Sequence, residues 1–503
     1  MTATIDTFDF SGGLRINPQQ PTTPIERRAI ALRKGDELRI PLNEHIGVSS
    51  RLIVSEGQRV LKYQLLASPN GHVSVGQHAP TSGYVKSTSI DNQNDVVLEC
   101  DGLDDSEELP PFQPLPSEPY SAGLQQSLYR RIAAAGIVGM GGAGFPAHVK
   151  LKEGMATEVG DLIVNGVECE PLSYGDQILI EDSTNDLIAG SEMLGNLLGA
   201  QRVLLAVNSG VDLVRLGKLS AGSRIETLIA SNRYPAGSEK QLIKIVKNVE
   251  LPLNRLPIHI GVVCYNVATV VAMYRAATLS MPLISRLVTV NGSKKTVAEV
   301  PIGLSIQTLL ELIDEVETKD TKITTGGMMM GRPTESVSSP VKKTTNEISI
   351  HAAARETTQP ARACVRCGEC VSVCPIKLQP QKLYELSRLG DLDDIQDHGL
   401  FDCIECGCCT YICPSDIPLV AHFRLSKAEV NGMAEASSNR AFLLQRYEAH
   451  LGRQDNATPA ERNAILADTE VLTTEGIDDE LAKLKQRLTK RGAAAIDDDK
   501  HDG

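Results

Sequence analysis

CVRCGECVSVCP, residues 364–375, and its repeat CIECGCCTYICP, residues 403–414, decide the fold of the C-terminal part of this chain. Each stretch spaces four cysteines as C-x2-C-x2-C-x3-C-P, a spacing in which three thiolates bind one cubane and the fourth binds a second. Zinc is the alternative, because four thiolates also bind zinc, but two complete copies with trailing prolines favour iron and sulfide. The sequence therefore predicts two [4Fe–4S] clusters, with Cys364, Cys367, Cys370 and Cys413 binding one and Cys403, Cys406, Cys409 and Cys374 binding the other.

The distribution of cysteines and the bulk composition agree with this prediction. Nine of the twelve cysteines lie between Cys364 and Cys413, and no export signal precedes them, which favours metal ligation in a reducing compartment over disulfides. The ninth, Cys408, is interpreted as a packed thiol. A net charge of −13 argues against a nucleic-acid partner. The most apolar stretch is interrupted by Arg275, short of the ~20 apolar residues that cross a bilayer, so we expect no transmembrane segment.

The chain is predicted to be a multidomain α/β protein. The five predicted segments are 1–120, 121–280, 281–345, 346–430 and 431–503. The first has short strands between turns and ends in a Pro-rich linker, the second alternates strands with helices as a parallel sheet requires, and the third returns to strands with one short helix. The fourth carries the cysteines. The fifth is polar and helical, with an apolar stripe predicted to be a docking face, or alternatively a coiled coil, made by Ile477, Leu481, Leu484 and Leu488.

A glycine-rich stretch, GIVGMGGAGFPAHVK at 136–150, lies near the start of the second segment. Gly139, Gly141 and Gly144 match the bare G-x-G-x-x-G pattern of dinucleotide loops, but a predicted helix precedes them where that motif needs a strand. No acidic residue ends a second strand at the expected distance. Taken alone, this stretch is more typical of a structural turn.

Its neighbours change that interpretation. GGAGFP followed by Lys150, and VNGVECEP at 164–171, resemble the flavin- and NADH-binding subunit of respiratory complex I. YPAGSEKQLI at 234–243 and CYNVAT at 264–269 are similar to later flavin-side loops of that family. Together with HAPTSGYV, PLISRLVTVNG and the double cluster motif, their order resembles the RnfC family of the Rnf electron-transport complexes from about residue 10 to residue 430.

The resemblance implies a fold for each segment. It implies an N-terminal β barrel-sandwich, similar to lipoyl domains but without a carrier lysine at its hairpin SPNGHVSV, and a Rossmann-like FMN/NADH domain. A β-grasp (SLBB) module and a helical two-cluster ferredoxin domain would follow. The barrel-sandwich and the β-grasp module are expected to be scaffold.

The resemblance also implies site residues. Gly139, Gly141, Gly142, Ala143 and Gly144 would surround the FMN phosphate and ribityl chain with backbone N–H groups, and Phe145 would lie beside the NADH base. The other implied contacts are Lys150 with phosphate or ribityl oxygens, Asn165 and Glu168 with the flavin, Glu170 with the NADH ribose or carboxamide, Gly237 and Glu239 on the nucleotide side, and Asn266 and Thr269 with phosphate oxygens. No catalytic residue is expected beyond this flavin site. Met140 and Val167 depart from complex I, which has an arginine and an acidic residue there.

The implied function is electron exchange. NAD(H) as substrate gives or takes two electrons as a hydride, clusters carry one at a time, and non-covalent FMN does both. The chain would be a peripheral arm on the cytoplasmic side of the cell membrane, bound to membrane subunits and a ferredoxin-type cluster protein of an Rnf-type complex. Two alternatives stay open: a soluble flavoprotein of the cobalamin-reductase type, and a non-catalytic scaffold that only carries clusters.

Overall fold

The computed structural model describes residues 10–16, 24–88, 95–116, 119–208, 210–252, 255–315, 321–334, 336–352, 361–433, 440 and 446. Contacts divide the chain into two units, Met1–Arg424 and Leu425–Gly503. Of the second unit, residues 425–433 are described and are helical. The apolar stripe predicted at 477–488 lies outside the described residues.

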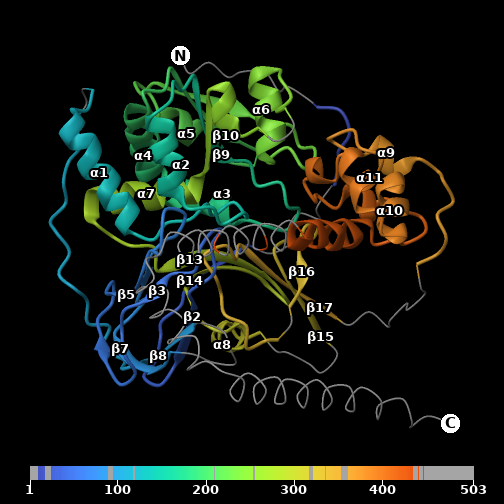
Figure 1. The fold of residues 1–503 in the computed structure, drawn as a ribbon. Helices are drawn as coiled ribbons and strands as arrows, with labels where there is room; N and C mark the ends of the chain where they lie inside the picture. Colours follow the sequence, from blue (N-terminus) through green and yellow to red (C-terminus); the bar gives the residue numbers. More distant parts are fainter. Residues whose placement is uncertain are drawn as a thin grey trace, which may run out of the picture. The chain divides into compact units, whose positions relative to one another are not determined.

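A parallel four-stranded sheet forms the centre of the predicted flavin domain (Figure 1). Its order is β11 (Ile225–Ile229), β10 (Arg202–Val207), β9 (Asp161–Gly166) and β12 (Val262–Asn266). All three pairings are parallel, as the alternation of strand and helix patterns predicts. Because β12 returns to the free side of β9, the sheet has a topological switch point between these two strands.

Both faces of this sheet are covered, so its strands are apolar on both sides. Leu162 and Val164 of β9 join the larger core, while Ile163 between them joins the core on the opposite face. The first face carries α1 (Ala122–Ala134), α2 (Ala147–Met155), α4 (Thr184–Leu198) and α7 (Val267–Leu279). The opposite face carries α6 (Glu239–Lys247) and Phe10. The shorter helices are α3 (Gly175–Asp182), α5 (Leu213–Leu219) and the 3-10 turn η1 (Pro257–Ile260).

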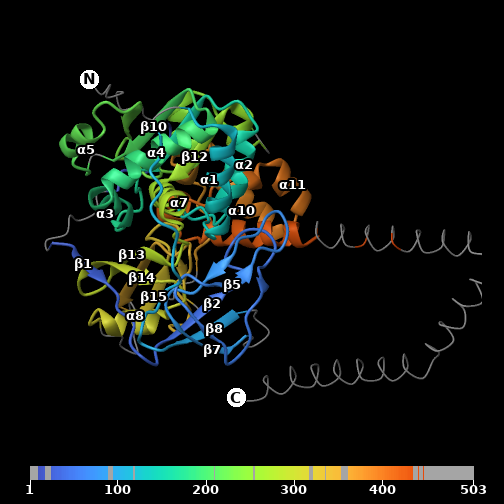
Figure 2. The same ribbon diagram turned by 90° about the vertical axis from the view of Figure 1, so that its left-hand side faces the viewer.

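The N-terminal segment folds into two small antiparallel sheets, the barrel-sandwich expected from its short strands. One sheet has the order β2 (Glu37–Pro41), β8 (Asp95–Cys100), β7 (Gly83–Ser87), β4 (Arg59–Val60). The other has the order β3 (Arg51–Leu52), β5 (Leu65–Ser68), β6 (Gln77–His78). Figure 2 shows these strands beside a third sheet, with which they share one hydrophobic core.

That third sheet has the arrangement expected of a β-grasp module, and it recruits strands from outside the predicted range. β13 (Ser285–Asn291) and β14 (Lys295–Pro301) form a hairpin, α8 (Ile306–Leu312) follows, and β15 (Thr321–Thr325) pairs with β16 (Arg332–Pro333). The central partner of β13 is β17 (Glu347–Ala352), which runs parallel to it. β1 (Glu26–Ala29) adds an edge strand against β14. Sequence patterns identify strands but not partners far along the chain, which is why these two were assigned to neighbouring segments.

The cysteine region forms a small helical domain around its own core. Its elements are α9 (Glu369–Ser372), α10 (Pro380–Leu389), α11 (Leu392–Asp397), the 3-10 turn η2 (Leu400–Asp402) and α12 (Cys408–Tyr411). Across the part of the chain that the structure describes, no helix has the length and apolar character needed to cross a bilayer.

One buried lysine joins three of these modules. Lys343, in the loop before β17, is 1% exposed, and its Nζ donates to Gly76 O (3.0 Å) of the barrel-sandwich and Gly136 O (2.9 Å) at the start of the glycine loop. Its own backbone N–H donates to Glu44 Oε2 at 2.9 Å. Burial lowers the pKa of Lys343 to about 8, from its usual value of 10.5. The folded chain therefore releases this proton more readily than the unfolded chain does.

We expect Lys343→Met to lower stability by about 1–3 kcal/mol, because two buried carbonyls lose their donor. Since the folded pKa lies below the unfolded one, protonated Lys343 penalises the fold at neutral pH, and the penalty disappears as pH rises from about 8 to about 10.5. The deficit of the variant should therefore grow between pH 7 and pH 10, measured as the difference in thermal midpoint from the unsubstituted chain. Exposed Lys152→Met is the control, and an equal deficit at both pH values would contradict this role of Lys343.

Candidate functional site

The predicted flavin-side segments meet at the switch point of the parallel sheet. The carboxyl end of β9 leads into 166–170, and that of β12 leads into Asn266, the N-cap of α7, whose side chain accepts from Ala268 N at 2.9 Å. Ligands of open α/β sheets bind at such points. The N-terminus of α7 also favours an anion through its dipole and free N–H groups.

The glycine loop lies over the start of α7. Gly139 N donates to Phe145 O (2.7 Å), Gly144 N donates to Gly139 O (3.2 Å), and Met140 N donates to Thr269 Oγ1 (3.0 Å). These bonds tie both ends of the loop, while its tip, residues 141–143, is exposed. Gly142 has φ +129°, a conformation that a side chain rarely adopts, and a Cβ there would meet only open space. A Cβ on Gly141 would lie 3.3 Å from Asn266 Cβ.

This arrangement fits a phosphate-bearing group. An open tip of small residues over a helix N-terminus leaves room for an anion to approach backbone donors closely. Thr269 is buried behind the loop, so the structure places its hydroxyl as a support for Met140 N rather than on the open side. Asn266 Nδ2 donates to Asp176 Oδ2 at 2.6 Å.

Two carboxylates lie close to this loop. Glu168 accepts from Ser173 Oγ (2.6 Å) and from the N–H groups of Asp176 (3.1 Å) and Gln177 (3.2 Å) at the start of α3. Burial raises the pKa of both Glu168 and Asp176, and each carboxylate opposes ionisation of the other. Arg286 of β13 offsets the pKa rise at Asp176.

Glu170, predicted to contact the NADH ribose or carboxamide, faces the β-grasp module. Its oxygens accept from Met329 N (2.9 Å) and Met330 N (3.0 Å), and burial raises its pKa to about 7. Tyr234 also bonds to Glu170, and the Tyr234 hydroxyl donates to Cys406 O at 2.6 Å. Glu170 and Tyr234 thus connect the flavin domain to the cysteine domain.

The other predicted residues form two smaller groups. Asn165 Nδ2 donates to Gly237 O (2.8 Å), and a Cβ on Gly237 would lie 2.1 Å from Val167 O, so only glycine fits. Lys150 Nζ donates to Glu239 Oε1 (3.0 Å) and to Cys264 O (3.0 Å). Burial lowers the pKa of Lys150, but the Glu239 carboxylate more than offsets this and the pKa is raised.

Sequence reasoning missed three residues of this region: Asp176, Tyr234 and Arg286. Tyr234 and Arg286 lie in the quoted motifs YPAGSEKQLI and PLISRLVTVNG, but no role was derived for them. Arg286 comes from β13, outside the predicted flavin domain, and its Nη2 donates to Met140 O at 3.2 Å. Only the tertiary contact reveals that role.

The two cysteine motifs fold alike. Three positions in each take a left-handed backbone: Arg366 (φ 56°), Gly368 (83°) and Lys377 (60°) in the first, and Glu405 (56°), Gly407 (81°) and Asp416 (54°) in the second. Left-handed residues between right-handed ones turn successive N–H groups toward one centre, a concavity that suits an anion. A cluster with four thiolates is such an anion, so the loops fit the predicted group.

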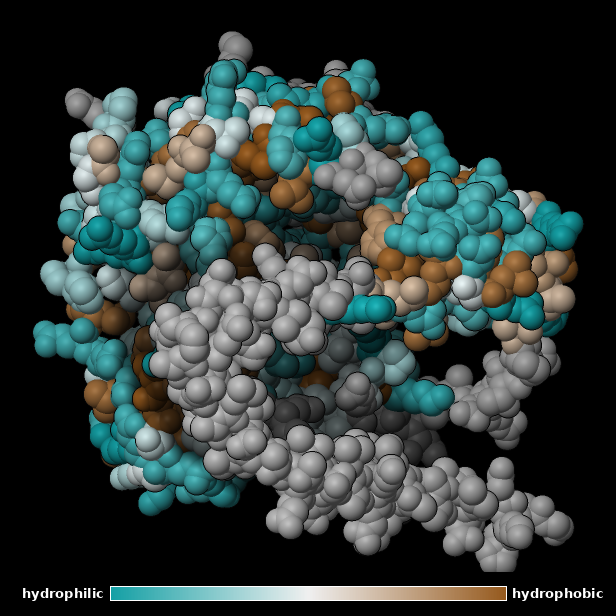
Figure 3. Space-filling view, in the orientation of Figure 1, coloured by the Kyte–Doolittle hydropathy of each residue, from teal (hydrophilic) through white to brown (hydrophobic). Residues whose placement is uncertain are grey.

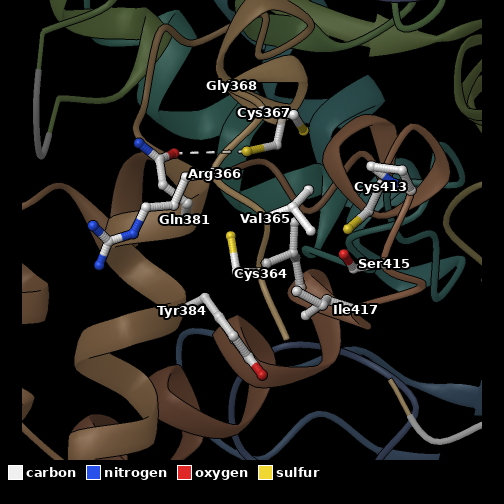
Figure 4. Close-up of a pocket in the computed structure, with 13 residues that line it drawn as sticks. Cys364, Val365, Arg366, Cys367, Gly368, Gln381, Tyr384, Cys413, Ser415 and Ile417 are labelled. Atoms are coloured by element: carbon white, nitrogen blue, oxygen red, sulfur yellow. Dashed lines mark hydrogen bonds between the residues drawn. The ribbon is translucent and has the colours of Figure 1, made fainter. Parts of the chain in front are cut away.

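Four of the predicted ligands share one hollow. Cys364, Cys367, Cys370 and Cys413, the outer cysteine set, line a single pocket with Val365, Tyr384, Ile417 and other residues (Figure 4). Cys370 Sγ lies 3.6 Å from Gln381 Oε1. Cys364 and Cys367 are exposed, so this pocket opens to the surface. Among the described residues, no three histidine, cysteine or acidic side chains converge as on one metal ion.

The inner cysteine set is Cys374, Cys403, Cys406 and Cys409. Cys409 is close enough to the other three for their charges to raise its pKa, although burial contributes most. Two backbones press on this set: a Cβ on Gly12 would lie 2.6 Å from Cys374 O, and one on Gly407 would lie 2.4 Å from Met329 O. Cys408 is buried and bonds to the Cys406 thiol. The inner set therefore lies against the flavin and β-grasp domains.

Three family models match the chain. They are the RnfC barrel sandwich hybrid domain at residues 8–102, the Nuo51 FMN-binding domain at 132–275, and a 4Fe-4S dicluster domain at 360–417. A protein of Yersinia pestis, named as the C-type subunit of an ion-translocating oxidoreductase complex, is 35% identical over 89% of this chain and 73% of its own length. The chain belongs to this family.

Two further proteins with the same name are similar. Those of Pseudomonas aeruginosa and Yersinia enterocolitica are 37% and 36% identical over 90% and 89% of this chain. The chain spans 60% and 65% of their lengths. A crystal structure of an NAD+-reducing [NiFe]-hydrogenase aligns with TM-score 0.43 and 18% identity over 62% of this chain and 63% of that one. The barrel-sandwich, FMN-domain and dicluster-domain predictions are thus confirmed by the family models.

The grouping of the cysteines makes a testable prediction. We expect Cys413→Ser to remove the outer cluster and to lower bound iron from about eight to about four per chain, because it joins the first motif's pocket from the second motif. Cys408→Ser is the matched control, since it changes a neighbouring buried thiol outside both sets, and should leave iron unchanged. Iron and acid-labile sulfide measured after anaerobic reconstitution provide the check. Loss of iron in Cys408→Ser with full iron in Cys413→Ser would reverse the assignment.

Proposed function

We propose that this chain exchanges electrons between NAD(H) and an ion-translocating oxidoreductase complex, through FMN at the glycine loop and two [4Fe–4S] clusters at the two cysteine sets. FMN supplies the step between hydride transfer and single-electron transfer. The chain would be a peripheral subunit at the cytoplasmic side of the cell membrane, where NAD(H) is available. The names of its relatives support membership of such a complex.

The contact between the flavin domain and the inner cysteine set carries this proposal. Tyr234 belongs to the segment that also holds Gly237 against Asn165, and its hydroxyl reaches Cys406 O at 2.6 Å. Lys240 and Gln241 of α6 add bonds to Asp402 O (3.3 Å) and Pro375 O (3.4 Å). A group at the glycine loop and a cluster at the inner set would thus be held by directly bonded domains.

The order of the carriers follows from exposure. The inner set is closed in by the N-terminal segment and the β-grasp loop, while Cys364 and Cys367 of the outer set are exposed. Electrons would therefore pass from the flavin site to the inner set, then to the outer set, and leave there, or take the reverse route. Apolar side chains are exposed on this domain (Figure 3), among them Val365 and Tyr411. They suit docking of a ferredoxin-type cluster protein of the complex.

The chain's own side chains have supporting roles in this scheme. Lys150, held by Glu239 and Cys264 O, keeps a positive charge between β12 and α6 on the flavin side. Glu168 fixes the start of α3 beside the loop. Glu170 holds the Met329–Met330 backbone over the inner set.

Adding NADH to the anaerobically reconstituted full chain tests the catalytic part of the proposal. We expect non-covalent FMN, about eight irons per chain, and bleaching of the flavin absorbance by NADH, followed by loss of the cluster absorbance. A non-catalytic scaffold would carry iron and show no bleaching. A chain that binds no flavin after reconstitution would overturn the catalytic role while leaving the clusters intact.

The loop assignment has its own test in Gly142→Ala. We expect FMN affinity to fall at least about tenfold, because the added Cβ strains the left-handed tip and fills space at the loop opening. Gly222→Ala is the matched control: it also has a positive φ (+87°) with open space around its Cβ, but lies in the turn after α5. FMN affinity is measured by quenching of flavin fluorescence. Equal affinities in the two variants would contradict the placement of FMN at this loop.

A further inference from the structure

The β-grasp module contacts the flavin side through side chains of one strand, β13. Arg286 Nη2 donates to Met140 O (3.2 Å), Thr289 Oγ1 accepts from Tyr174 N (3.1 Å), and Asn291 Nδ2 donates to Leu172 O (3.0 Å). All three lie outside residues 132–275, the range that matches the FMN-binding family model. A module expected to be scaffold thus reaches the loop at which FMN is proposed to bind.

Arg286 is an unusual group to bury. It is 6% exposed, and its Nε is buried without a partner in the part of the chain that the structure describes. Burial lowers the pKa of Arg286 to about 10, while the nearby Asp176 and Glu168 carboxylates oppose that shift. A buried cation is costly unless it serves the charges around it. Its placement here balances two buried carboxylates that would otherwise repel an anion.

Arg286 also fixes a peptide group of the glycine loop. The Met140 carbonyl and the Gly141 N–H belong to the same planar trans peptide, so they point in opposite directions. The bond from Arg286 to Met140 O therefore orients the Gly141 N–H away from β13. A cationic donor on the carbonyl also polarises that N–H and strengthens it as a donor. The preceding peptide is held in the same way, by Met140 N on Thr269 Oγ1.

We propose that Arg286 is a positioning residue of the flavin site: it orients and polarises the Gly141 N–H toward the phosphate of FMN, which makes β13 of the β-grasp module part of that site. This inference rests on the proposed binding of FMN at the glycine loop. It adds a residue from a separate module and assigns it to one part of the cofactor, the phosphate.

The test compares FMN with riboflavin, which has the same ring and ribityl chain but no phosphate. Arg286→Met and Arg286→Lys are made in the full chain with its clusters reconstituted. Arg275→Met is the matched control, because Arg275 also makes an ion pair within the flavin domain, with Asp186 (2.8 Å), but does not contact the loop. Dissociation constants for both flavins and the thermal midpoint of the flavin-free chain are measured for each variant.

We expect Arg286→Met to weaken FMN binding at least about tenfold, as for loss of one charge-assisted hydrogen bond, and to weaken riboflavin binding less than about threefold. Arg286→Lys, which keeps the charge, should be intermediate, and Arg275→Met should leave both affinities unchanged. A purely structural role predicts equal losses for the two flavins together with a lower thermal midpoint, and that result would overturn the inference.

Two further outcomes also decide the matter. FMN affinity of Arg286→Met within about twofold of the unsubstituted chain overturns the role of Arg286 and leaves the proposed function standing. Failure of the unsubstituted chain to bind FMN overturns both.

Discussion

The parallel pairing of β9 with β12 is the constraint on which the flavin side depends. β10 and β11 extend the sheet on one side of β9, and β12 comes back to the other side. The segments that follow β9 and β12 therefore diverge, and the gap between them receives the glycine loop through Met140 and Thr269. With β12 beyond β11, Asn266 and the N-terminus of α7 would lie far from the loop, and no anion site would form there.

Charge balance is the second constraint at this edge. Two carboxylates, Glu168 and Asp176, are buried close together, and burial raises the pKa of each. Backbone donors at the start of α3 and the guanidinium of Arg286 compensate for their burial. The same cation supports the loop that is proposed to hold a phosphate, so one residue serves stability and binding together.

The modules interlock, and this distinguishes the chain from a row of independent domains. β1 and β17 come from segments on either side of the β-grasp module and complete its sheet. Lys343 bonds to the barrel-sandwich and to the flavin domain. Gly12, near the N-terminus, packs on Cys374 O in the cysteine domain. Electron transfer between a flavin and clusters needs fixed separations, and such contacts hold the domains in a fixed arrangement.

The amino-acid sequence by itself determined the local features of this protein. The cysteine spacing predicts the cluster domain, because three of four ligands to each cluster lie within one short turn of chain. The glycine stretch and the alternation of strands with helices predict the loop and the parallel sheet, since both depend on nearby residues and their periodicity. Even the crossed assignment of Cys413 and Cys374 follows from the repeat.

Only the tertiary structure decided which distant residues complete each site. Arg286 at Met140, Lys343 at Gly136 and Glu170 at the Met329–Met330 backbone join segments that are separated by well over a hundred residues. Nothing in the local pattern around any of them encodes the partner, because such contacts arise from the packing of whole modules. Strand pairing behaves in the same way: β17 is recognisable as a strand in the sequence, and its place beside β13 is set by the shared core beneath both.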